Sequence, residues 1–238
     1  SIVALLMLVF SVCPILAPLI GSLVVDWSNW RAVFWVIAAI AVAALVLVVT
    51  GLRETRPPEA RTDSGLRSAL AGYAVLLRDR QFLGLIFIGA CGVSSFFTYL
   101  ANSPFVLMEH FGLSPIQYGL AFGINAASFI GASQFTARLG RRFGLGPLVR
   151  MAVWGYAGAM TLLLLLDLLG VDRLLPLLAL LFIGFGFLGL LTPATAVLAL
   201  DRHGPIAGTA SALMGTTQFL CGALMMALVG RFVDGSSR

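Results

Sequence analysis

The sequence predicts an all-α membrane protein that crosses the bilayer seven times. Seven stretches with few or no charges are each long enough to span it: residues 2–25, 32–52, 82–102, 116–137, 147–169, 174–200 and 206–229. A helix needs about 20 mostly apolar residues to cross the hydrocarbon core. The composition agrees, because 60% of the residues are hydrophobic and only 11% are charged. Backbone groups in lipid must be hydrogen-bonded within the segment, so we expect each stretch to be a helix.

The charges lie mainly between the spans, and the net charge of +5 comes from arginine. One set of arginines alternates with a second, smaller set along the chain. The larger set lies after the second, fourth and sixth spans: Arg53, Arg56, Arg61, Arg67, Arg78, Arg80, Arg138, Arg141, Arg142, Arg150 and Arg202. The smaller set is Arg31, Arg173, Arg231 and Arg238. The positive-inside rule therefore puts the first residue in the cytoplasm, and it makes membrane lipid rather than nucleic acid the partner of these charges.

The longest polar segment lies between the second and third spans, from Arg53 to Arg80. Pro57 and Pro58 end the preceding helix, and residues 66–77 form an amphipathic stretch that could lie along the membrane surface. We interpret this segment as a linker between two helical bundles. The three cysteines, Cys13, Cys91 and Cys221, all fall within spans. We expect them to be small buried residues rather than metal ligands.

Two spans carry small residues at every fourth position. In the first span they are Cys13, Ala17 and Gly21, with Pro14 and Pro18 between them. In the fourth span they are Gly119, Gly123, Ala127 and Gly131. Small side chains at this spacing let another helix approach closely. Such ridges suit either static helix packing or a sliding contact between bundles.

The first ridge carries a resemblance to a known family. The pattern Cys13-x-x-x-Ala17-Pro18-x-x-Gly21-Ser22 resembles the Gly-x-x-x-Gly-Pro-x-x-Gly-Gly motif of drug/proton antiporters in the major facilitator superfamily. Further segments look like the bicyclomycin-resistance (Bcr/CflA) subfamily, and they cover nearly the whole chain in the right order. They are residues 14–18, 30–35, 54–55, 57–59, 103–107, 111–115 and 207–213.

The resemblance implies a position within a twelve-helix fold, with these spans matching family helices five to eleven. Residues 1–52 would be the last two helices of the N-terminal bundle, 53–81 the cytoplasmic linker, and 82–238 the C-terminal bundle without its final helix. The implied function is export of small amphipathic, drug-like compounds in exchange for protons across the bacterial inner membrane. The proton gradient is the energy source, and no cofactor is implied. The protein would be a monomer, the acids that carry protons would lie on earlier helices, and this fragment alone would be inactive.

Two departures from the family pattern affect these expectations. Cys13, Ala17 and Ser22 replace glycines of the antiporter motif, which keeps the residues small. The loop expected at residues 139–144 resembles the superfamily's cytoplasmic motif A through Leu139, Arg141, Arg142 and Gly144. Arg141, however, stands where that motif has an aspartate. We therefore interpret these arginines as topology signals.

Polar residues within spans are costly in lipid, so they usually face protein or a water-filled cavity. Ser95, Tyr99 and Asn102 share one face of the third span, with Phe96 beside them. In the seventh span Met214, Gln218 and Met225 form a second stripe together with Ser211. We predict that both stripes contribute to a substrate cavity, although packing between helices is the alternative for each residue.

Two more spans contain residues of interest. Asn125 and Gln134 lie nine residues apart on opposite sides of the fourth span, and Asn125 is the better cavity candidate. In the sixth span, Gly186, Gly189 and Pro193 are candidate hinge residues, because glycine and proline interrupt the helices of transporters.

Three other functions are alternatives to this one. A seven-span receptor matches the number of helices, but its amino end would lie outside the cell, opposite to the arginine pattern. A membrane-embedded enzyme would need paired histidines, a Ser/Lys or Asp/Asp pair or a metal set, and the sequence contains none of these at helical spacing. A major facilitator with a substrate other than a drug remains the third alternative.

Overall fold

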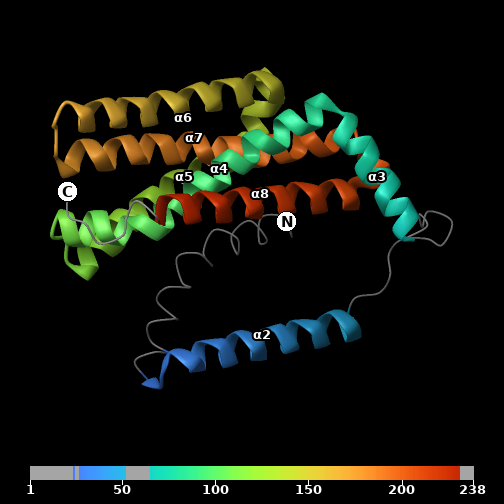
Figure 1. The fold of residues 1–238 in the computed structure, drawn as a ribbon, viewed down its shortest axis with the longest axis horizontal. Coiled ribbons are helices and arrows are strands. Elements are labelled where there is room, and N and C mark those ends of the chain that lie inside the picture. The colour runs from blue at the N-terminus through green and yellow to red at the C-terminus, as the bar shows by residue number, and fades with distance from the viewer. Residues whose placement is uncertain (1–23, 25–26, 52–64, 231–238) are drawn as a thin grey trace. The chain divides into compact units, whose positions relative to one another are not determined.

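A computed structural model describes residues 24, 27–51 and 65–230 of the chain. The chain divides into two compact units, residues 1–64 and 65–238, which are described separately. The first predicted span lies outside the described residues except for Val24, and its ridge of Cys13, Ala17 and Gly21 lies wholly outside them. Figure 1 shows the described helices of both units.

In the first unit the described element is helix α2, Trp30–Gly51. It begins where Asn29 accepts hydrogen bonds through Oδ1 from the amides of Arg31 (2.9 Å) and Ala32 (3.2 Å), which caps the helix. No residue of α2 is buried, although the helix is apolar on all sides. A helix of this kind is typical of a membrane span.

The described part of the second unit, residues 65–230, contains six α-helices and two short elements. They are α3 (Leu66–Arg78), α4 (Arg80–Pro104), the π-helix η2 (Phe105–His110), α5 (Pro115–Phe143), α6 (Leu145–Leu168), α7 (Leu174–Asp201), the 3₁₀-helix η3 (Gly204–Ile206) and α8 (Ala207–Gly230). Every element in the described part of the chain is helical, so the all-α prediction is confirmed. The helix ends agree with the predicted spans to within a few residues, with two exceptions. The third span was predicted to end at residue 102, but α4 and η2 continue to His110, and the fourth was predicted to end at residue 137, but α5 continues to Phe143.

Five described helical segments are long and apolar enough to cross a membrane. They are residues 30–51, 80–110, 145–168, 174–201 and 204–230. Helix α5, which covers the fourth predicted span, is not among these five. Its 29 residues are sufficient in length, but they include Asn125, Ser128, Ser133 and Gln134, which lower its hydropathy. Hydropathy alone therefore identifies α5 less clearly than its neighbours.

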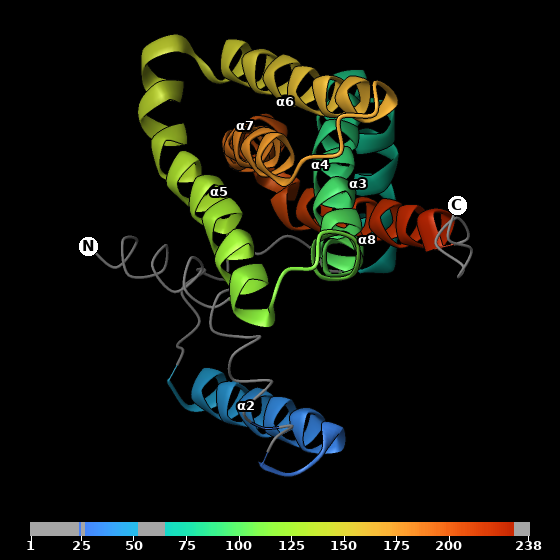
Figure 2. The same ribbon diagram turned by 90° about the vertical axis from the view of Figure 1, so that its left-hand side faces the viewer.

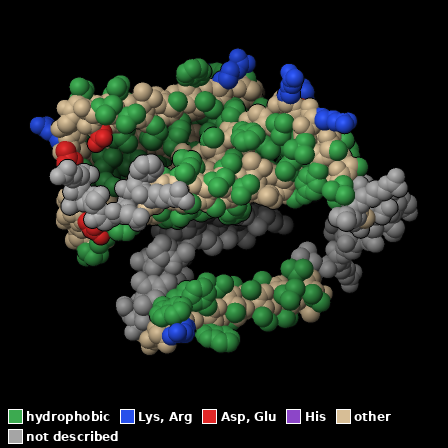
Figure 3. Space-filling model, viewed as in Figure 1, with side chains coloured by type: hydrophobic (Ala, Val, Ile, Leu, Met, Phe, Trp, Pro, Cys, Tyr) green, Lys and Arg blue, Asp and Glu red, His purple; other side chains and the backbone are tan. Residues whose placement is uncertain are grey.

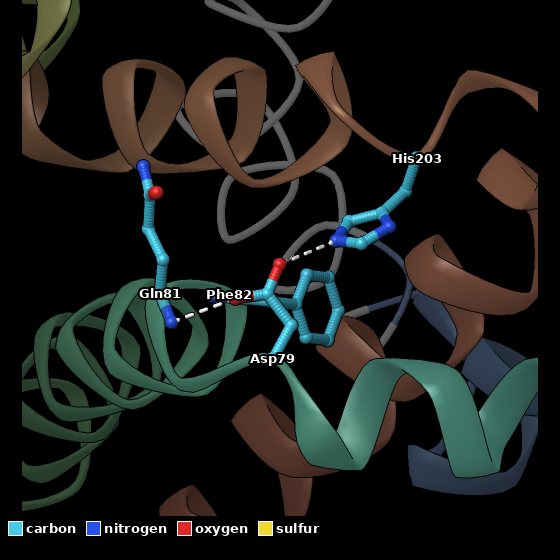
Figure 4. Close-up of polar contacts among 4 residues, drawn as sticks. All are labelled: Asp79, Gln81, Phe82 and His203. Atoms are coloured by element: carbon cyan, nitrogen blue, oxygen red, sulfur yellow. Dashed lines mark hydrogen bonds and ion pairs between the residues drawn. The ribbon is translucent and has the colours of Figure 1, made fainter.

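Local side-chain bonds define where the helices begin. Asp79 caps α4, because its carboxylate accepts hydrogen bonds from the amides of Gln81 (2.8 Å) and Phe82 (3.2 Å) (Figure 4). Ser114 caps α5 in a capping box with Gln117, in which each side chain bonds the other's backbone amide.

The end of α4 follows from Pro104, which has no amide hydrogen to donate. After it the chain continues as the π-helix 105–110, and the amide of Phe111 donates to the carbonyl of Val106 at 3.1 Å. The wider turn carries the helix to residue 110, well past the predicted end of this span.

Helix α7 lies at the centre of the second unit, with α4, α5 and α6 around it (Figure 2). Helix α8 packs mainly against α4. The closest approach is at Gly189 of α7, where a β-carbon would collide with the backbone of Phe129 on α5. The buried core between α6 and α7 includes Leu148, Ala152 and Leu188.

Charge separates the two ends of this helical unit (Figure 3). Because the helices alternate in direction, the start of α4 and the end of α5 lie at one end of the unit. Arginines gather at that end: Arg78, Arg80, Arg138, Arg141, Arg142, Arg150 and Arg202. The opposite end carries Glu109, Asp167 and Asp172 with Arg173. This distribution follows the alternation on which the predicted orientation rests.

Two segments differ from their predicted form. The expected motif A-like loop is wrong in its bounds, because α5 continues to Phe143. The helix ends only at Gly144, whose φ of 83° suits glycine and whose amide bonds the carbonyl of Gly140 at 2.9 Å. Part of the expected linker forms α3, which packs against α4 and α8, with Leu76 fully buried.

Candidate functional site

Helix α4 presents two different faces to its surroundings. Successive residues of a helix are rotated by about 100° around its axis. Thr98 is therefore rotated by about 200° from Phe96, and the two side chains point to nearly opposite sides of α4. Thr98 lines a cavity, whereas Phe96 packs against aromatic side chains of α5 and α7. The predicted cavity residues are divided between these two faces.

The cavity has a volume of about 860 Å³ and is bounded by α4, η2, α6, α7 and α8. Its described lining residues are Phe87, Cys91, Ser94, Ser95, Thr98, Tyr99, Asn102, Ser103, Val106, Leu107, Tyr156, Met160, Leu177, Leu181, Phe185, Cys221, Leu224, Met225 and Leu228. These residues are predominantly apolar, and they include no carboxylate, guanidinium or imidazole group. Helix α5 contributes none of them.

Several polar groups of this lining form hydrogen bonds within the protein. Ser95 donates to the carbonyl of Cys91 at 3.0 Å, and Asn102 donates to the carbonyl of Thr98 at 2.8 Å. Tyr99 accepts a hydrogen bond through its hydroxyl oxygen from Nδ2 of Asn125 at 3.1 Å. The Ser94 hydroxyl, in contrast, is buried and has no hydrogen-bond partner among the described residues.

The structure brings four of the eight predicted cavity residues to this cavity: Ser95, Tyr99, Asn102 and Met225. The predicted shared face of the first three is therefore present. Their role in binding substrate stays a prediction.

The other four predicted cavity residues lie elsewhere. Asn125 is buried beside Tyr99, and its Oδ1 has no hydrogen-bond partner among the described residues. Met214 packs near the buried side chains of Leu76 and Phe82. Phe96 lies on the second face of α4, and Gln218 of α8 lies beside Gly89 of α4.

Phe96 is at the centre of an aromatic group on that second face. Its ring centroid lies 6.4 Å from that of Phe129 on α5, 6.2 Å from that of Phe185 on α7, and 6.0 Å from that of Phe97. Phe97 in turn lies 6.0 Å from Phe219 of α8, which is 67% exposed. Side chains from four helices therefore form one connected aromatic surface.

Gln218 of α8 lies on the same side of α4, nearer the arginine-rich end. A β-carbon on Gly89 would be 3.3 Å from the Gln218 amide nitrogen and 3.5 Å from the Thr195 hydroxyl. The half-exposed carboxamide of Gln218 therefore lies where α4, α7 and α8 meet, within the membrane-spanning part of α8. Such a group can donate and accept hydrogen bonds.

Sequence reasoning missed several members of both faces. Phe129 and Thr195 lie beside the second face, Tyr156 and Cys91 line the cavity, and Phe185 both contacts Phe96 and lines the cavity. Phe129 could have been found from the sequence, because it lies four residues after Asn125 in the same span. The position of Tyr156 in the cavity could not be predicted, because nothing in the sequence indicates which helix lies beside α4.

The small residues of α5 face open space within this unit. A β-carbon added at Gly119, Gly123 or Gly131 would meet no atom within 4 Å, and Ala127 is exposed. Glycine inside a helix costs about 1 kcal/mol relative to alanine. Packing within the unit does not account for these glycines.

The candidate hinge glycines of α7, unlike the glycines of α5, lie close to atoms of a neighbouring helix. Helix α7 is continuous from Leu174 to Asp201 with Pro193 inside it. A β-carbon on Gly186 would lie 3.0 Å from the hydroxyl of Ser128, and Gly189 meets the backbone of Phe129. Close packing against α5 accounts for both glycines. A hinge at these positions stays a prediction.

Among the residues that the structure describes, no cluster of three or more His, Cys, Asp or Glu side chains could hold a metal ion. Arg141 and Arg142 are exposed at the end of α5, and in the described ranges neither forms a salt bridge.

Comparison with known proteins gives a match to the family model described as Major Facilitator Superfamily, over residues 1–226. An uncharacterized MFS-type transporter of Bacillus subtilis, YdgK, is 31% identical over 229 residues, 95% of this chain and 57% of the relative. A bicyclomycin resistance protein homolog of Haemophilus influenzae is 28% identical over 93% of this chain and 56% of its own length. The multidrug resistance protein MdtL of Escherichia coli is 31% identical over 115 residues, 48% of this chain and 28% of the relative.

The chain thus spans a little over half the length of the first two relatives. The predicted superfamily is confirmed, and the relative named for bicyclomycin resistance agrees with the predicted subfamily. The chain belongs to the Major Facilitator Superfamily, whose members are membrane transporters and not enzymes.

Proposed function

We propose that this chain is part of a proton-coupled efflux carrier that exports small amphipathic organic compounds by alternating access. Two relatives are named for bicyclomycin and multidrug resistance, which supports this class of substrate. The observation that carries the proposal is the small-residue face of α5. A β-carbon on any of its three glycines would meet no described atom within 4 Å.

Glycines lower the stability of a helix, and these glycines are not needed for packing within their own unit. A face of this kind suits close approach by another helix. The first predicted span carries a matching ridge at Cys13, Ala17 and Gly21. We propose that these two ridges form the seam between the bundles. Small side chains let such a seam slide, so that the bundles can rock about a central site. A proton and a substrate then drive the change only through their different affinities for the two states.

We propose that substrate contacts come from the second face of α4. Phe96 and its aromatic neighbours offer flat apolar surface, and Gln218 offers an amide. This combination suits compounds that are partly apolar and carry hydrogen-bonding groups. The other bundle would supply the opposite wall.

The arginine-rich end would face the cytoplasm of a bacterial cell, with residues 53–81 on the same side. The carrier would act as a monomer in the inner membrane, and the proton-carrying acids would lie outside the described residues. Accessibility labelling of cysteines placed at Arg61 and Arg141 tests this orientation. Both should react from the cytoplasmic side, and labelling from opposite sides would overturn it.

The transport proposal is tested in inverted membrane vesicles that contain the carrier expressed from its complete reading frame. Respiration acidifies the vesicle interior, and addition of an exported compound should then release protons and reduce the pH gradient. Bicyclomycin is the first compound to use, with vesicles lacking the carrier as the control. If compounds accumulate without any change in the pH gradient, proton coupling is wrong. If a panel of amphipathic antibiotics is not transported at all, the carrier has a different substrate.

A further inference from the structure

Gly89 lies in the interior of α4, where an alanine would favour the helix by about 1 kcal/mol. Its surroundings differ from those of the other glycines of this helix. A β-carbon on Gly92 would meet a leucine side chain of α7 at 2.8 Å, and one on Gly84 would meet no described atom within 4 Å. A β-carbon on Gly89 would instead meet two polar atoms, Nε2 of Gln218 at 3.3 Å and Oγ1 of Thr195 at 3.5 Å. Apolar packing therefore does not explain why this position lacks a side chain.

The same two contacts show how the Gln218 carboxamide is turned. Its nitrogen lies 3.3 Å from the β-carbon position of Gly89, whereas its oxygen, Oε1, lies more than 4 Å from that position. The Thr195 hydroxyl donates its hydrogen to the carbonyls of Leu191 (2.9 Å) and Thr192 (3.0 Å), so its oxygen can only accept a further hydrogen bond. An amide N–H is a suitable neighbour for that oxygen. The nitrogen therefore faces α4 and α7, and Oε1 is turned away from Gly89.

Gly89 and Phe96 lie on one stripe of α4. The two residues are seven positions apart, so their directions differ by only about 20°, and they are separated by about 10 Å along the helix axis. The aromatic group around Phe96 therefore lies about two turns from the Gln218 carboxamide. A molecule that contacts both has an apolar part and a hydrogen-bonding group about 10 Å apart.

We infer that Gly89 is a positioning residue for substrate specificity. Its missing side chain keeps the Gln218 carboxamide close to α4, with Oε1 turned to accept a hydrogen bond from an O–H or N–H group of the exported compound. Gly89 itself touches no substrate and acts through Gln218. The inference rests on the proposed function, in which Gln218 contacts substrate. It adds that a compound with a hydrogen-bond donor is preferred over the same compound without one.

Proton release from the inverted vesicles described above measures this preference. The probes are bicyclomycin and a derivative in which its hydroxyl groups are methylated, and the readout is the concentration of each that gives half-maximal proton release. The wild-type carrier should need a higher concentration of the methylated compound, by at least about 3-fold for the loss of one hydrogen bond. Gln218→Ala should remove this preference. Gly89→Ala should reduce it by at least about 2-fold, the lower limit for coupling between residues in contact.

The other two glycines of α4 give matched controls. Gly84→Ala places its methyl group in open space, so it should leave the preference unchanged. Gly92→Ala meets an apolar side chain, so it tests the effect of packing and should also leave the preference unchanged. The decisive variant combines Gly89→Ala with Gln218→Ala. A residue that acts only through Gln218 has no further effect once the carboxamide is gone.

The outcomes separate this inference from the proposed function. If Gln218→Ala loses the preference while Gly89→Ala behaves like Gly84→Ala, the inference is wrong and the substrate face of α4 stands. If Gln218→Ala keeps the preference, or if neither compound is exported, the proposed function is wrong at this site and the inference fails with it. A further loss of preference when Gly89→Ala is added to Gln218→Ala would also overturn the inference.

The double variant keeps the test informative if Gly89→Ala alone does not fold. The methyl group then has no Gln218 amide to displace, so the melting temperature of the double variant should match that of Gln218→Ala. A stable double variant supports the contact between Gly89 and Gln218. A double variant that stays unfolded contradicts it.

Discussion

His203 donates a hydrogen bond from Nε2 to Oδ2 of Asp79 at 3.1 Å, across 124 residues of sequence (Figure 4). Asp79 separates α3 from α4, and His203 lies in the turn before α8. The ring of His203 also meets that of Phe82 edge to face, with centroids 5.2 Å apart. The side chains of His203 and Asp79 are 11% and 27% exposed. This pair therefore fastens α3 and α4 to the α7–α8 turn at the arginine-rich end of the unit.

Two substitutions of Asp79 should destabilise this part of the protein to different degrees. Asp79→Asn keeps a side-chain oxygen that can cap α4, but it loses the charged acceptor for His203. Asp79→Ala loses both bonds, and the missing cap alone should cost about 1 kcal/mol. The apparent melting temperature in detergent should fall more for alanine than for asparagine. Asp201→Ala is the control, because Asp201 is exposed at the same end of the unit. Equal melting temperatures for Asp79→Ala and Asp201→Ala would contradict the role of the pair.

The same carboxylate predicts a dependence of stability on pH. The amide of Phe82 lowers the pKa of Asp79 below its ordinary 3.8, and the Gln81 amide and His203 lower it further against the opposing effect of burial. A lowered pKa in the folded state means that the carboxylate contributes stability above pH 3.8. That contribution is lost as the pH falls through the lower, folded value. The difference in melting temperature between wild type and Asp79→Asn should therefore shrink between pH 5 and pH 3 (a range set about the ordinary pKa). A difference that stays constant over this range would show that the Asp79 charge plays no part.

Two glycine substitutions should separate the seam from the core of the second unit. Gly123 faces open space, so Gly123→Leu should leave folding intact and abolish export if the seam needs a small residue. Gly189 faces the backbone of Phe129, so Gly189→Leu should cost about 1–3 kcal/mol or more through overpacking. Drug resistance of cells and the melting temperature of the purified carrier measure the two effects. Normal resistance with Gly123→Leu would argue against the seam.

Gln218 and Met225 should differ in their effects, although they lie on one side of α8 in the sequence pattern. Gln218→Ala should weaken export of hydrogen-bonding substrates by about 3- to 10-fold, which corresponds to the loss of one hydrogen bond. Met225→Ala should change the relative resistance to different drugs little, because Met225 is 42% exposed and lines the cavity rather than the second face of α4. Resistance profiles across a panel of antibiotics check both expectations. A changed profile with Met225→Ala would return that residue to the substrate site.

The spans and the shared face of Ser95, Tyr99 and Asn102 could be predicted because each helix in lipid must close its own hydrogen bonds. The period of 3.6 residues then decides which side chains lie together. Lateral neighbours could not be predicted in this way. Gln218 and Met225 differ by only about 20° on α8, yet Gln218 lies beside Gly89 and Met225 lines the cavity.

Other features of the structure could not be predicted for the same reason, because they depend on which helices lie side by side. The bond between Asp79 and His203 exists because two helix ends meet in space, and neither residue carries a local signal for the other. Whether a polar stripe faces substrate or a helix depends on which helices surround it. The cavity beside α4 is lined by residues of α6 and, in its described lining, by none of α5, and no local pattern in these helices indicates that arrangement.

The most direct measurement is a crosslink across the proposed seam. Antiparallel ridges would place Ala17 beside Gly123, so both are changed to cysteine in a carrier whose native cysteines are replaced. Oxidation should join the two positions in high yield and stop export, and a reductant should restore it. A pair that never crosslinks, or a crosslinked carrier that still exports at the normal rate, would contradict a carrier that works by movement along this face of α5.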